Sequence, residues 1–457
     1  MMLWTALLCA PLLLVSIPPL VDAPGHIGSA SIETAPAGSP LLDYYVWHWS
    51  LTPNLGSELL MKALSPLLGT LAAGWSICLI ALALLAGGAL ATIRVLNPRS
   101  GHGVGFALIF VLGYPWVWGF LNFMIASGIS LLAFAGSVQL KPRPGRRAML
   151  LLTAAPMAFF CHAVGGILLP VLVLAEATGS LIDGRHRGPK VLASLVRDVW
   201  PLAVLLPVAF AWQANRSADS PTDLGWDWLG KADFLMEVLR DQVAALDIGT
   251  AVAAYLVALA GPLLGSRWTW RQGLPALAVF GLYVLAPSRL NGSEAVDWRL
   301  LSVAMILALG LQDWTRARSS VAKAVLWIGS ALLLVRIVVQ ADGFLAYATD
   351  YRGQLAALDH VRPGSRGASQ RWYGIHAARR ATGAGWGRSC ARPRWTGSTT
   401  SGCSIRVSRT LRPSGFISSG SGTAARFMSG NLGLAGPAPL APRPQQQGEA
   451  KQQVTQS

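Results

Sequence analysis

Few residues of this sequence have side chains that could do chemistry, and they stand beside apolar runs. His162 follows such a run in FFCHAVGG. There an imidazole can bind a substrate or carry protons, and the alternative is a half-buried histidine that a backbone carbonyl satisfies. Asp297 and Arg299 stand close to Glu294 in SEAVDWRL, where they can form an ion pair with each other.

Arg336 lies four residues before the end of an apolar run. A charge at mid-membrane costs about 2.5 to 3.5 kcal/mol and less near the surface. Arg336 therefore either reaches back to the membrane surface, or faces an internal cavity and pairs with a lipid phosphate, which suits a guanidinium fork. Glu176, near the end of another run, is expected to reach the surface in the same way.

The composition places the chain in a membrane. Of its 457 residues, 53% are hydrophobic and only 13% are charged, with a mean hydropathy of +0.46. A soluble domain could not bury so much apolar surface. The sequence has no P-loop, GxSxG, HExxH or strand-following GxGxxG, and its five cysteines show no metal-ligand spacing.

Long apolar runs without alternation predict an all-α, polytopic transmembrane helical bundle, because a spanning helix needs about 20 apolar residues and no water satisfies the backbone in lipid. About eleven spans are expected. They are Leu3–Val21, Leu67–Ile93, Val104–Gly113, Leu121–Leu140, Ala148–Phe160, Val164–Leu181, Val199–Trp212, Gly249–Leu264, Leu274–Ala286, Leu300–Leu311 and Val321–Gln340.

The first run, Leu3–Val21, is interpreted as an uncleaved span rather than a signal peptide, because no Lys or Arg precedes it. Orientation follows from the loops. One alternating set of loops holds fifteen Lys and Arg residues and the other holds six. By the positive-inside rule, the N-terminus is cytoplasmic, and the 22–66 loop and the C-terminal part lie outside.

The first outer loop, residues 22–66, is long and mixes aromatic residues with scattered charge. Its YYVWHW stretch resembles an interfacial aromatic belt, and Leu55, Leu59, Leu60 and Leu64 predict an amphipathic helix lying on the headgroups. A second outer segment, GYPWVWGFLNF, interrupts a helix. Such a break either lines a cavity or forms an aromatic-capped turn.

The strong positive charge belongs to the C-terminal tail. Residues 361–457 contain thirteen Arg and one Lys against a single acid, Glu449. The segment has no apolar period, so it is expected to be disordered. One hypothesis is that it translates GC-rich DNA in the wrong frame, and the alternative is a basic arm that binds anionic lipid or nucleic acid.

These observations divide the chain into three parts. They are a transmembrane domain over residues 1–340 with the long outer loop 22–66, an outer helix over 341–362, and a disordered basic tail over 363–457.

Several motifs, namely VDAPGHIG, SPLLDYYVWHWSLTPNLGSELL, WGFLNF, FFCHAVGG and VDWRL, resemble an uncharacterised group of bacterial polytopic membrane proteins. The order of elements, with an acidic motif after the first span and a long outer loop, resembles the GT-C class of membrane glycosyltransferases. The group has an Arg three residues after its His, where this sequence has Ser29. That difference bears on whether this chain is active.

The resemblance implies a function. A GT-C enzyme transfers a sugar from a polyprenyl-phosphate donor to an envelope acceptor at the outer face, and Asp22 matches the carboxylate that acts on the acceptor as general base. Arg336 or Arg299 would stabilise the departing phosphate. The implied substrate-binding residues are His26, His48, Asn54, His162, Asp297, Arg299 and Arg336.

The resemblance implies no resident cofactor and no protein-bound metal, although a divalent ion is a second option. The expected partners are membrane lipid and the polyprenyl-phosphate sugar donor, with no nucleic acid, and the expected location is the bacterial inner membrane. The alternative function is a non-catalytic membrane component or a transporter in envelope polysaccharide assembly. A transporter should show internal repeats or paired intramembrane charges, which the sequence does not reveal.

Reporter fusions test the predicted orientation. A fusion after Arg147 should report the cytoplasm and one after Asp350 the outer side, because the basic loops stay inside. Alkaline phosphatase and fluorescent-protein fusions at both positions make the measurement. If both positions report the cytoplasm, the predicted orientation is wrong.

Overall fold

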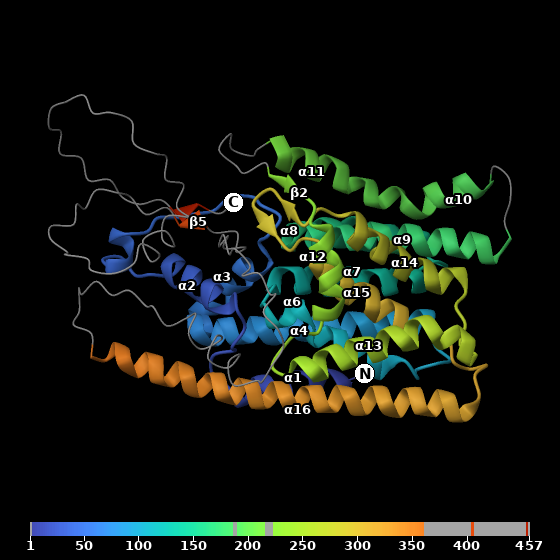
Figure 1. Cartoon of the computed structure of the whole chain (residues 1–457). Helices are drawn as coiled ribbons and strands as arrows, with labels where there is room; N and C mark the ends of the chain where they lie inside the picture. Colours follow the sequence, from blue (N-terminus) through green and yellow to red (C-terminus); the bar gives the residue numbers. More distant parts are fainter. Residues whose placement is uncertain (1, 186–189, 215–222, 361–403, 406–453, 456–457) are drawn as a thin grey trace.

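The computed structural model describes residues 2–185, 190–214, 223–360, 404–405 and 454–455. It is a bundle of helices that run side by side (Figure 1). Within the described residues, six helical segments are long and apolar enough to cross a membrane. They are Thr70–Leu96, Leu121–Gln139, Ala163–Asp183, Val191–Ala214, Ala244–Leu264 and Ser319–Ala356. The chain is a multi-pass membrane protein.

The first half of the bundle alternates long helices with short turns. Its elements are α1 (Met2–Cys9), η1 (Ala10–Leu14), α2 (Ala23–Glu33), η2 (Pro40–Asp43), β1 (Trp47–His48), α3 (Gly56–Leu68), α4 (Thr70–Leu96), α5 (Val104–Ile109), η3 (Phe110–Leu112), α6 (Tyr114–Val117), α7 (Leu121–Gln139), α8 (Pro144–Cys161) and α9 (Ala163–Asp183).

The second half continues the bundle and ends in a very long helix. Its elements are α10 (Lys190–Val199), η4 (Trp200–Val204), α11 (Leu205–Ala214), β2 (Leu224–Gly225), α12 (Trp228–Glu237), α13 (Ala244–Ala260), η5 (Gly261–Leu264), α14 (Trp270–Leu285), β3 (Arg289–Leu290), β4 (Ser293–Glu294), α15 (Trp298–Gly310), α16 (Ser319–Leu358), β5 (Ser404–Ile405) and β6 (Val454–Thr455). The short strands β2, β3 and β4 pair in that order, and β6 lies between β1 and β5.

Each of the eleven predicted segments contains a helix, but the count of about eleven spans is not confirmed. Six segments meet the length and hydropathy of a span, whereas Met2–Leu14, Val104–Val117 and Trp298–Gly310 are shorter apolar helices. The expectation of a continuous first span to Val21 is wrong, since the helix ends at Leu14. Pro18 and Pro19 explain this end, because proline lacks the N–H of a helix and restricts the residue before it.

The last helix is continuous across the predicted boundary at residue 340. It runs as α16 without a break from Ser319 to Leu358, so the predicted span and the predicted outer helix are parts of one helix. The predicted disorder of residues 363–457 lies outside the described residues, apart from β5 and β6.

The amphipathic helix predicted after the outer loop exists as α3, but its protein-facing side is the polar one. Ser57 and Glu58 are buried, with exposed fractions of 0% and 5%, whereas Leu59 is half exposed. The α3 helix packs on α2, α4 and α7. Leu55 is buried, and Leu60 and Leu64 are partly buried against the core, so only Leu59 of the four predicted leucines points to another surface. A buried carboxylate faces the bundle beside them.

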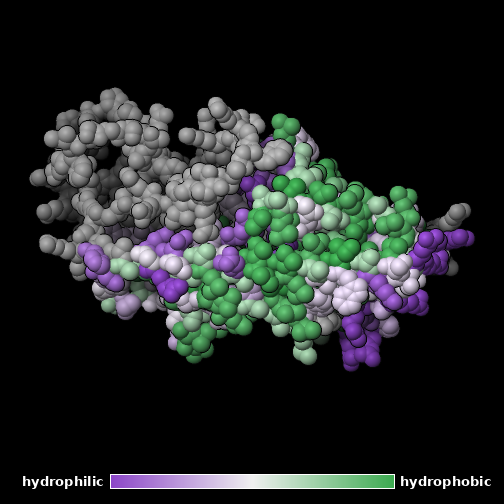
Figure 2. Space-filling model, turned by 60° about the horizontal axis from the view of Figure 1, so that its bottom comes forward, coloured by the Kyte–Doolittle hydropathy of each residue, from purple (hydrophilic) through white to green (hydrophobic). Residues whose placement is uncertain are grey.

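The molecular surface agrees with a membrane location. Figure 2 shows a broad hydrophobic band across the middle of one face, with hydrophilic residues gathered toward both ends. Apolar side chains such as Leu206, Phe210 and Leu259 are exposed on the protein surface. In a water-soluble protein such side chains would favour aggregation, whereas in a bilayer they contact the equally apolar lipid tails.

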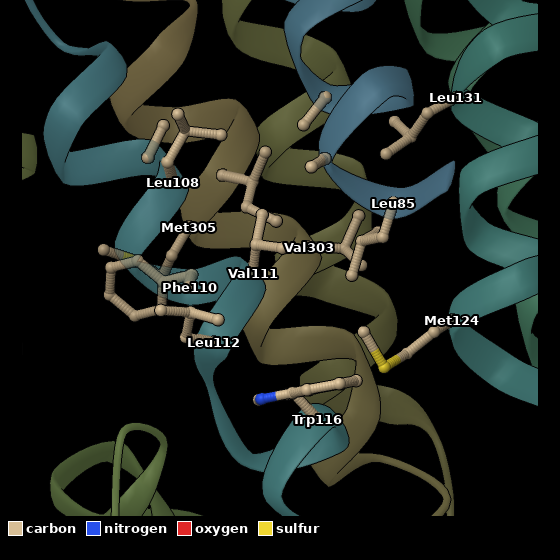
Figure 3. Close-up of a cluster of buried hydrophobic side chains, with 14 of the residues drawn as sticks. Leu85, Leu108, Phe110, Val111, Leu112, Trp116, Met124, Leu131, Val303 and Met305 are labelled. Carbon is tan, nitrogen blue, oxygen red and sulfur yellow. The ribbon is translucent and has the colours of Figure 1, made fainter. Parts of the chain in front are cut away.

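The core includes the short helices α5 and η3, which both pack against α4 and α15, and α5 also packs against α16. Figure 3 shows Leu85 of α4, Val111 of η3 and Val303 of α15 pointing toward one another. Phe110 and Val111 are 0% and 1% exposed. The α5 to α6 segment is thus enclosed on its sides by other helices, which fixes the turn that follows it.

Close approach of α4 and α7 depends on two glycines. A Cβ atom on Gly88 would lie 2.8 Å from the Gly128 carbonyl oxygen, and a Cβ on Gly128 would lie 2.6 Å from the Leu84 carbonyl carbon. Small residues at such crossings let two backbones approach within a membrane. A larger side chain would force the helices apart.

Replacing Gly88 by leucine should destabilise the fold by about 2 kcal/mol, since overpacking a tight contact typically costs 1 to 3 kcal/mol. Thermal unfolding in detergent, followed by size-exclusion fluorescence, measures the effect. The neighbouring substitution Gly87→Leu is the matched control, because nothing lies within 4 Å of a Cβ at Gly87. Equal melting temperatures for the two variants would contradict this role of Gly88.

Candidate functional site

Asp22 is held in place by the turn between α6 and α7. Its backbone N–H donates to the Trp118 carbonyl at 3.0 Å, and the Val21 N–H donates to the Val117 carbonyl at 3.3 Å. Gly119 has a φ of +74°, and a Cβ there would lie 3.1 Å from the Asp22 nitrogen. Any other residue at 119 would be strained and would push Asp22 away.

Asp22 is half-buried at the start of α2. Its carboxylate interacts electrostatically with His26, Tyr114 and Arg299. The sequence separates Asp22 from Arg299 by most of the chain, so only the fold brings this acid and this cation together. The pair is the centre of the candidate site.

Arg299 is buried between the imidazole of His162 and the aromatic ring of Phe120. Its Nη1 lies 2.5 Å from Nε2 of His162, and its Nη2 donates to the Glu294 carbonyl at 3.3 Å. The guanidinium carbon lies 4.1 Å from the centroid of the Phe120 ring, a cation–π contact. Its Nε has no hydrogen-bond partner within the described part of the chain. Arg299 thus keeps one buried donor unused.

The contact with Arg299 decides the protonation of His162. Arginine can only donate, so Nε2 of His162 must be the bare acceptor and Nδ1 carries the proton of a neutral ring. The 3.4 Å approach of the Gly165 N–H to Nδ1 is then not a hydrogen bond, because both groups are donors. His162 is therefore a neutral hydrogen-bond acceptor for Arg299. This contact differs from the alternative in the sequence analysis, a half-buried histidine that donates to a backbone carbonyl.

His26, predicted to bind substrate, instead belongs to a buried polar network. Its Nδ1 lies 3.1 Å from Glu58 Oε1 and 3.1 Å from the Ser57 hydroxyl. The Asn122 amide donates to Glu58 Oε2 and to the Asn54 carbonyl, both at 3.1 Å. His26, Glu58 and Ser57 are not a hydrolase triad, because both partners share one ring nitrogen. The network connects α2, α3 and α7.

Both members of the His26–Glu58 pair favour their charged forms. Burial alone would lower the pKa of His26, but the hydrogen bond to Glu58 and its charge outweigh burial and raise it. Burial alone would raise the pKa of Glu58, but His26 and the Asn122 amide outweigh it and lower it. The pair is an internal imidazolium–carboxylate bridge.

Asp297 does not pair with Arg299, so that expectation is wrong. The Asp297 carboxylate forms a short ion pair with Lys231 and accepts from the Ser288 hydroxyl at 2.8 Å. Lys231 also donates to the carbonyls of Tyr283 and Ala286, at 2.9 and 2.8 Å. Lys231, on α12, is 5% exposed, and no motif in the sequence indicates that it is buried. This pair ties α12 to the start of α15.

Arg336 does not reach the surface, and both of its Nη atoms contact protein groups. Its Nη1 pairs with Asp247 Oδ1 at 2.5 Å, and its Nη2 donates to the Leu239 carbonyl at 2.8 Å. Arg336 and Asp247 are 4% and 1% exposed. The prediction failed because Asp247, the partner, lies on a different helix far away in sequence.

Three further residues from the sequence analysis have surroundings of their own. His48 is exposed on β1, and the backbone of half-buried Asn54 serves the Asn122 network. Glu176 is 1% exposed rather than at the surface, and it pairs with Lys141 and Arg271. Among the described residues, no group of three His, Cys, Asp or Glu side chains could hold a metal ion.

Comparisons with known proteins give limited information. No family model matches the chain, and no curated protein matches it. Among solved structures, the crystal structure of ArnT from Cupriavidus metallidurans in the apo state aligns with a TM-score of 0.42 and 14% identity, over 76% of this chain and 74% of that chain. At that TM-score and identity, the likeness supports no conclusion about the reaction.

Breaking the buried pair with Lys231→Met should cost about 3 to 5 kcal/mol of stability, because it leaves the Asp297 carboxylate buried without a counter-charge. Replacing both partners, as in Lys231→Met with Asp297→Leu, should recover much of that loss. Thermal unfolding in detergent measures both effects.

The control is Arg240→Ala, which removes an exposed pair with Glu237 and should change stability by less than about 0.5 kcal/mol. A double variant no more stable than Lys231→Met would rule out the charge as the cause.

Proposed function

We propose that this protein is a membrane glycosyltransferase that moves a sugar from a polyprenyl-phosphate donor to an envelope acceptor. One observation carries the proposal. The short turn after α6 holds both reacting groups, since the Trp118 carbonyl binds the Asp22 backbone and the Phe120 ring lies under the Arg299 guanidinium. A base and a cation held by one turn suit displacement of a phosphate by a hydroxyl.

The proposed step uses Asp22 as general base. Its carboxylate takes the proton of an acceptor hydroxyl while that oxygen attacks the anomeric carbon of the donor sugar. The bond between the anomeric carbon and the phosphate oxygen breaks, and the polyprenyl phosphate leaves with the electron pair. Arg299 stabilises the negative charge that develops on that phosphate.

Arg299 suits this role better than Arg336. The Nη atoms of Arg336 are engaged by Asp247 and the Leu239 carbonyl. His162 contacts Arg299 as a neutral ring that leaves the positive charge of the guanidinium in place. A guanidinium that is always protonated and already desolvated binds phosphate oxygens strongly.

A lipid-linked donor fits the surroundings of α2. An open groove of about 840 Å³ lies where η1 meets the junction of α3 and α4, with Leu13, Leu68, Leu71 and Trp75 among its lining residues. The Ser31 hydroxyl of α2 lies 3.4 Å from that of Thr70 at the same junction. An apolar groove next to the helix that begins at Asp22 supports a donor with a hydrocarbon chain. The proposal places the reaction at the outer face of a bacterial inner membrane, with a cytoplasmic N-terminus.

A transporter of envelope polysaccharide precursors is the second candidate, and one observation favours it. Buried paired charges, expected of a transporter, exist in Arg336–Asp247. Asp241 lies beside them, and its backbone N–H donates to Asp247 at 2.8 Å. Burial raises the pKa of the Asp241 carboxyl to about 6. The positive charge of Arg336 lowers this pKa, and the negative charge of Asp247 raises it. A carboxyl that titrates near neutral pH suits proton coupling.

Replacing Asp22 by asparagine should reduce sugar transfer by about 10² to 10⁴-fold, the usual contribution of a general base. The chromosomal gene is exchanged for the variant, and envelope glycans are measured by mass spectrometry. Asp43→Asn is the matched control, because Asp43 is an exposed acid of the same outer loop.

An unchanged glycan profile in Asp22→Asn, in a host where deletion of the gene alters that profile, would exclude the general-base role. In that case, loss of glycan export in Asp241→Asn would favour the transporter.

A further inference from the structure

The helix that begins at Asp22 makes further contacts with the bundle beyond those of the Asp22 backbone. The His26 N–H donates to the Asp22 carbonyl at 3.2 Å, so the two residues form the first turn of α2. The side chain of the next residue, Ile27, lies against Gly74 of α4, with Ile27 Cγ1 2.4 Å from where a Gly74 Cβ would be. Between these contacts, His26 forms its bridge to α3.

The His26–Glu58 ion pair is part of a buried hydrogen-bond network that holds α2 on α3. Glu58 is 5% exposed and receives His26, the Ser57 hydroxyl at 3.0 Å and the Asn122 amide at 3.1 Å. The short contact from the Ser57 N–H to the Asn122 side chain fixes the start of α3 on α7. A buried carboxylate with one cationic partner is costly to leave unpaired. Release of His26 is therefore unfavourable.

We propose that His26 and Glu58 are positioning residues, whose ion pair holds α2 against α3 and α4 and so keeps Asp22 beside Arg299. The inference rests on the proposed function only in treating the position beside Arg299 as the reacting position. The His26–Glu58 ion pair, called the latch from here on, is a property of the fold. The role of His26 proposed here is separate from the substrate-binding role that the resemblance implies, and it rests on the contact of His26 with Glu58.

Proton loss from His26 removes the latch. The charged and titratable groups around it are Glu58 on α3, Asp22 at the start of α2, and more distant Glu33, Lys62 and Cys161. Because the pKa of His26 is raised, the stabilisation is fully present below about 6.5, the ordinary value, and is lost as pH rises through the raised pKa. Removing Glu58 should move that loss to lower pH.

An engineered disulfide measures the position of α2 without any enzymatic assay. In full-length protein with its five cysteines replaced by serine or alanine, Ile27→Cys and Gly74→Cys are introduced together. The Ile27 Cβ lies 3.9 Å from an ideal Gly74 Cβ, within the range that a disulfide requires. The fraction oxidised in a glutathione buffer, read by mass spectrometry, reports how often α2 is docked.

The matched control pair is Trp268→Cys with Gly273→Cys, whose Cβ atoms lie 3.4 Å apart at the start of α14, away from the latch. Dividing by this pair removes the general effect of pH on thiols. Adding His26→Gln should lower the normalised equilibrium constant for the Ile27–Gly74 disulfide by about tenfold or more, since it leaves Glu58 buried and unpaired.

Adding Glu58→Gln to that variant should restore much of the disulfide, because it removes the lone charge; a loss of packing alone would not be rescued in this way. Glu58→Gln by itself should shift the alkaline loss of the disulfide to lower pH, because burial lowers the pKa of His26 once the hydrogen bond and charge of Glu58 no longer oppose it. An unchanged disulfide equilibrium in both single variants overturns the proposal.

If His26→Gln also disrupts the control pair, the comparison rests on Glu58→Gln, which buries no unpaired charge. An unaltered pH profile there overturns the latch. If the latch holds but Asp22→Asn leaves glycans unchanged, the proposed function fails and the positioning of α2 stands.

Discussion

A charged side chain that folding takes out of water must find a partner of opposite charge, and this bundle depends on that constraint. In the part of the chain that the structure describes, four buried carboxylates receive their cations from other helices or loops. They are Glu58 with His26, Glu176 with Lys141 and Arg271, Asp247 with Arg336, and Asp297 with Lys231. Hydrocarbon does not discriminate between one apolar helix face and another, whereas an unpaired charge tolerates few arrangements. These pairs therefore select which helices are neighbours.

The turn between α6 and α7 converts that arrangement into a site. The Tyr114 N–H donates to the Val238 carbonyl at 2.9 Å, and the Tyr114 ring meets Phe234 edge-on at 5.0 Å, so the turn is anchored to the end of α12. Trp298 stacks on Phe234 at 4.8 Å and brings the adjacent Arg299 to the same aromatic cluster. Gly119 then lets the Asp22 backbone approach. Aromatic packing thus positions Arg299, and Gly119 leaves room for Asp22.

Predictions from the sequence succeeded where local composition suffices. Apolar runs located helices at each expected segment, because a stretch without charges is stable in lipid only as a helix. The predictions of helix length failed where the end of a helix does not coincide with the end of the apolar run. Pro18 and Pro19 end the first helix before its apolar run ends, and α16 continues past the apolar residues because a helix needs no hydrophobic sequence once it has formed.

The sequence by itself determined that this is a helical membrane protein, and it singled out Asp22, His162 and Arg299 as residues of interest. Only the tertiary structure decided their partners. The choice of Lys231 for Asp297, of Asp247 for Arg336 and of Glu58 for His26 joins residues 32 to 89 positions apart. No local pattern encodes such a choice, because it follows from which helix faces pack together. The proximity of Asp22 to Arg299 is a consequence of the same packing.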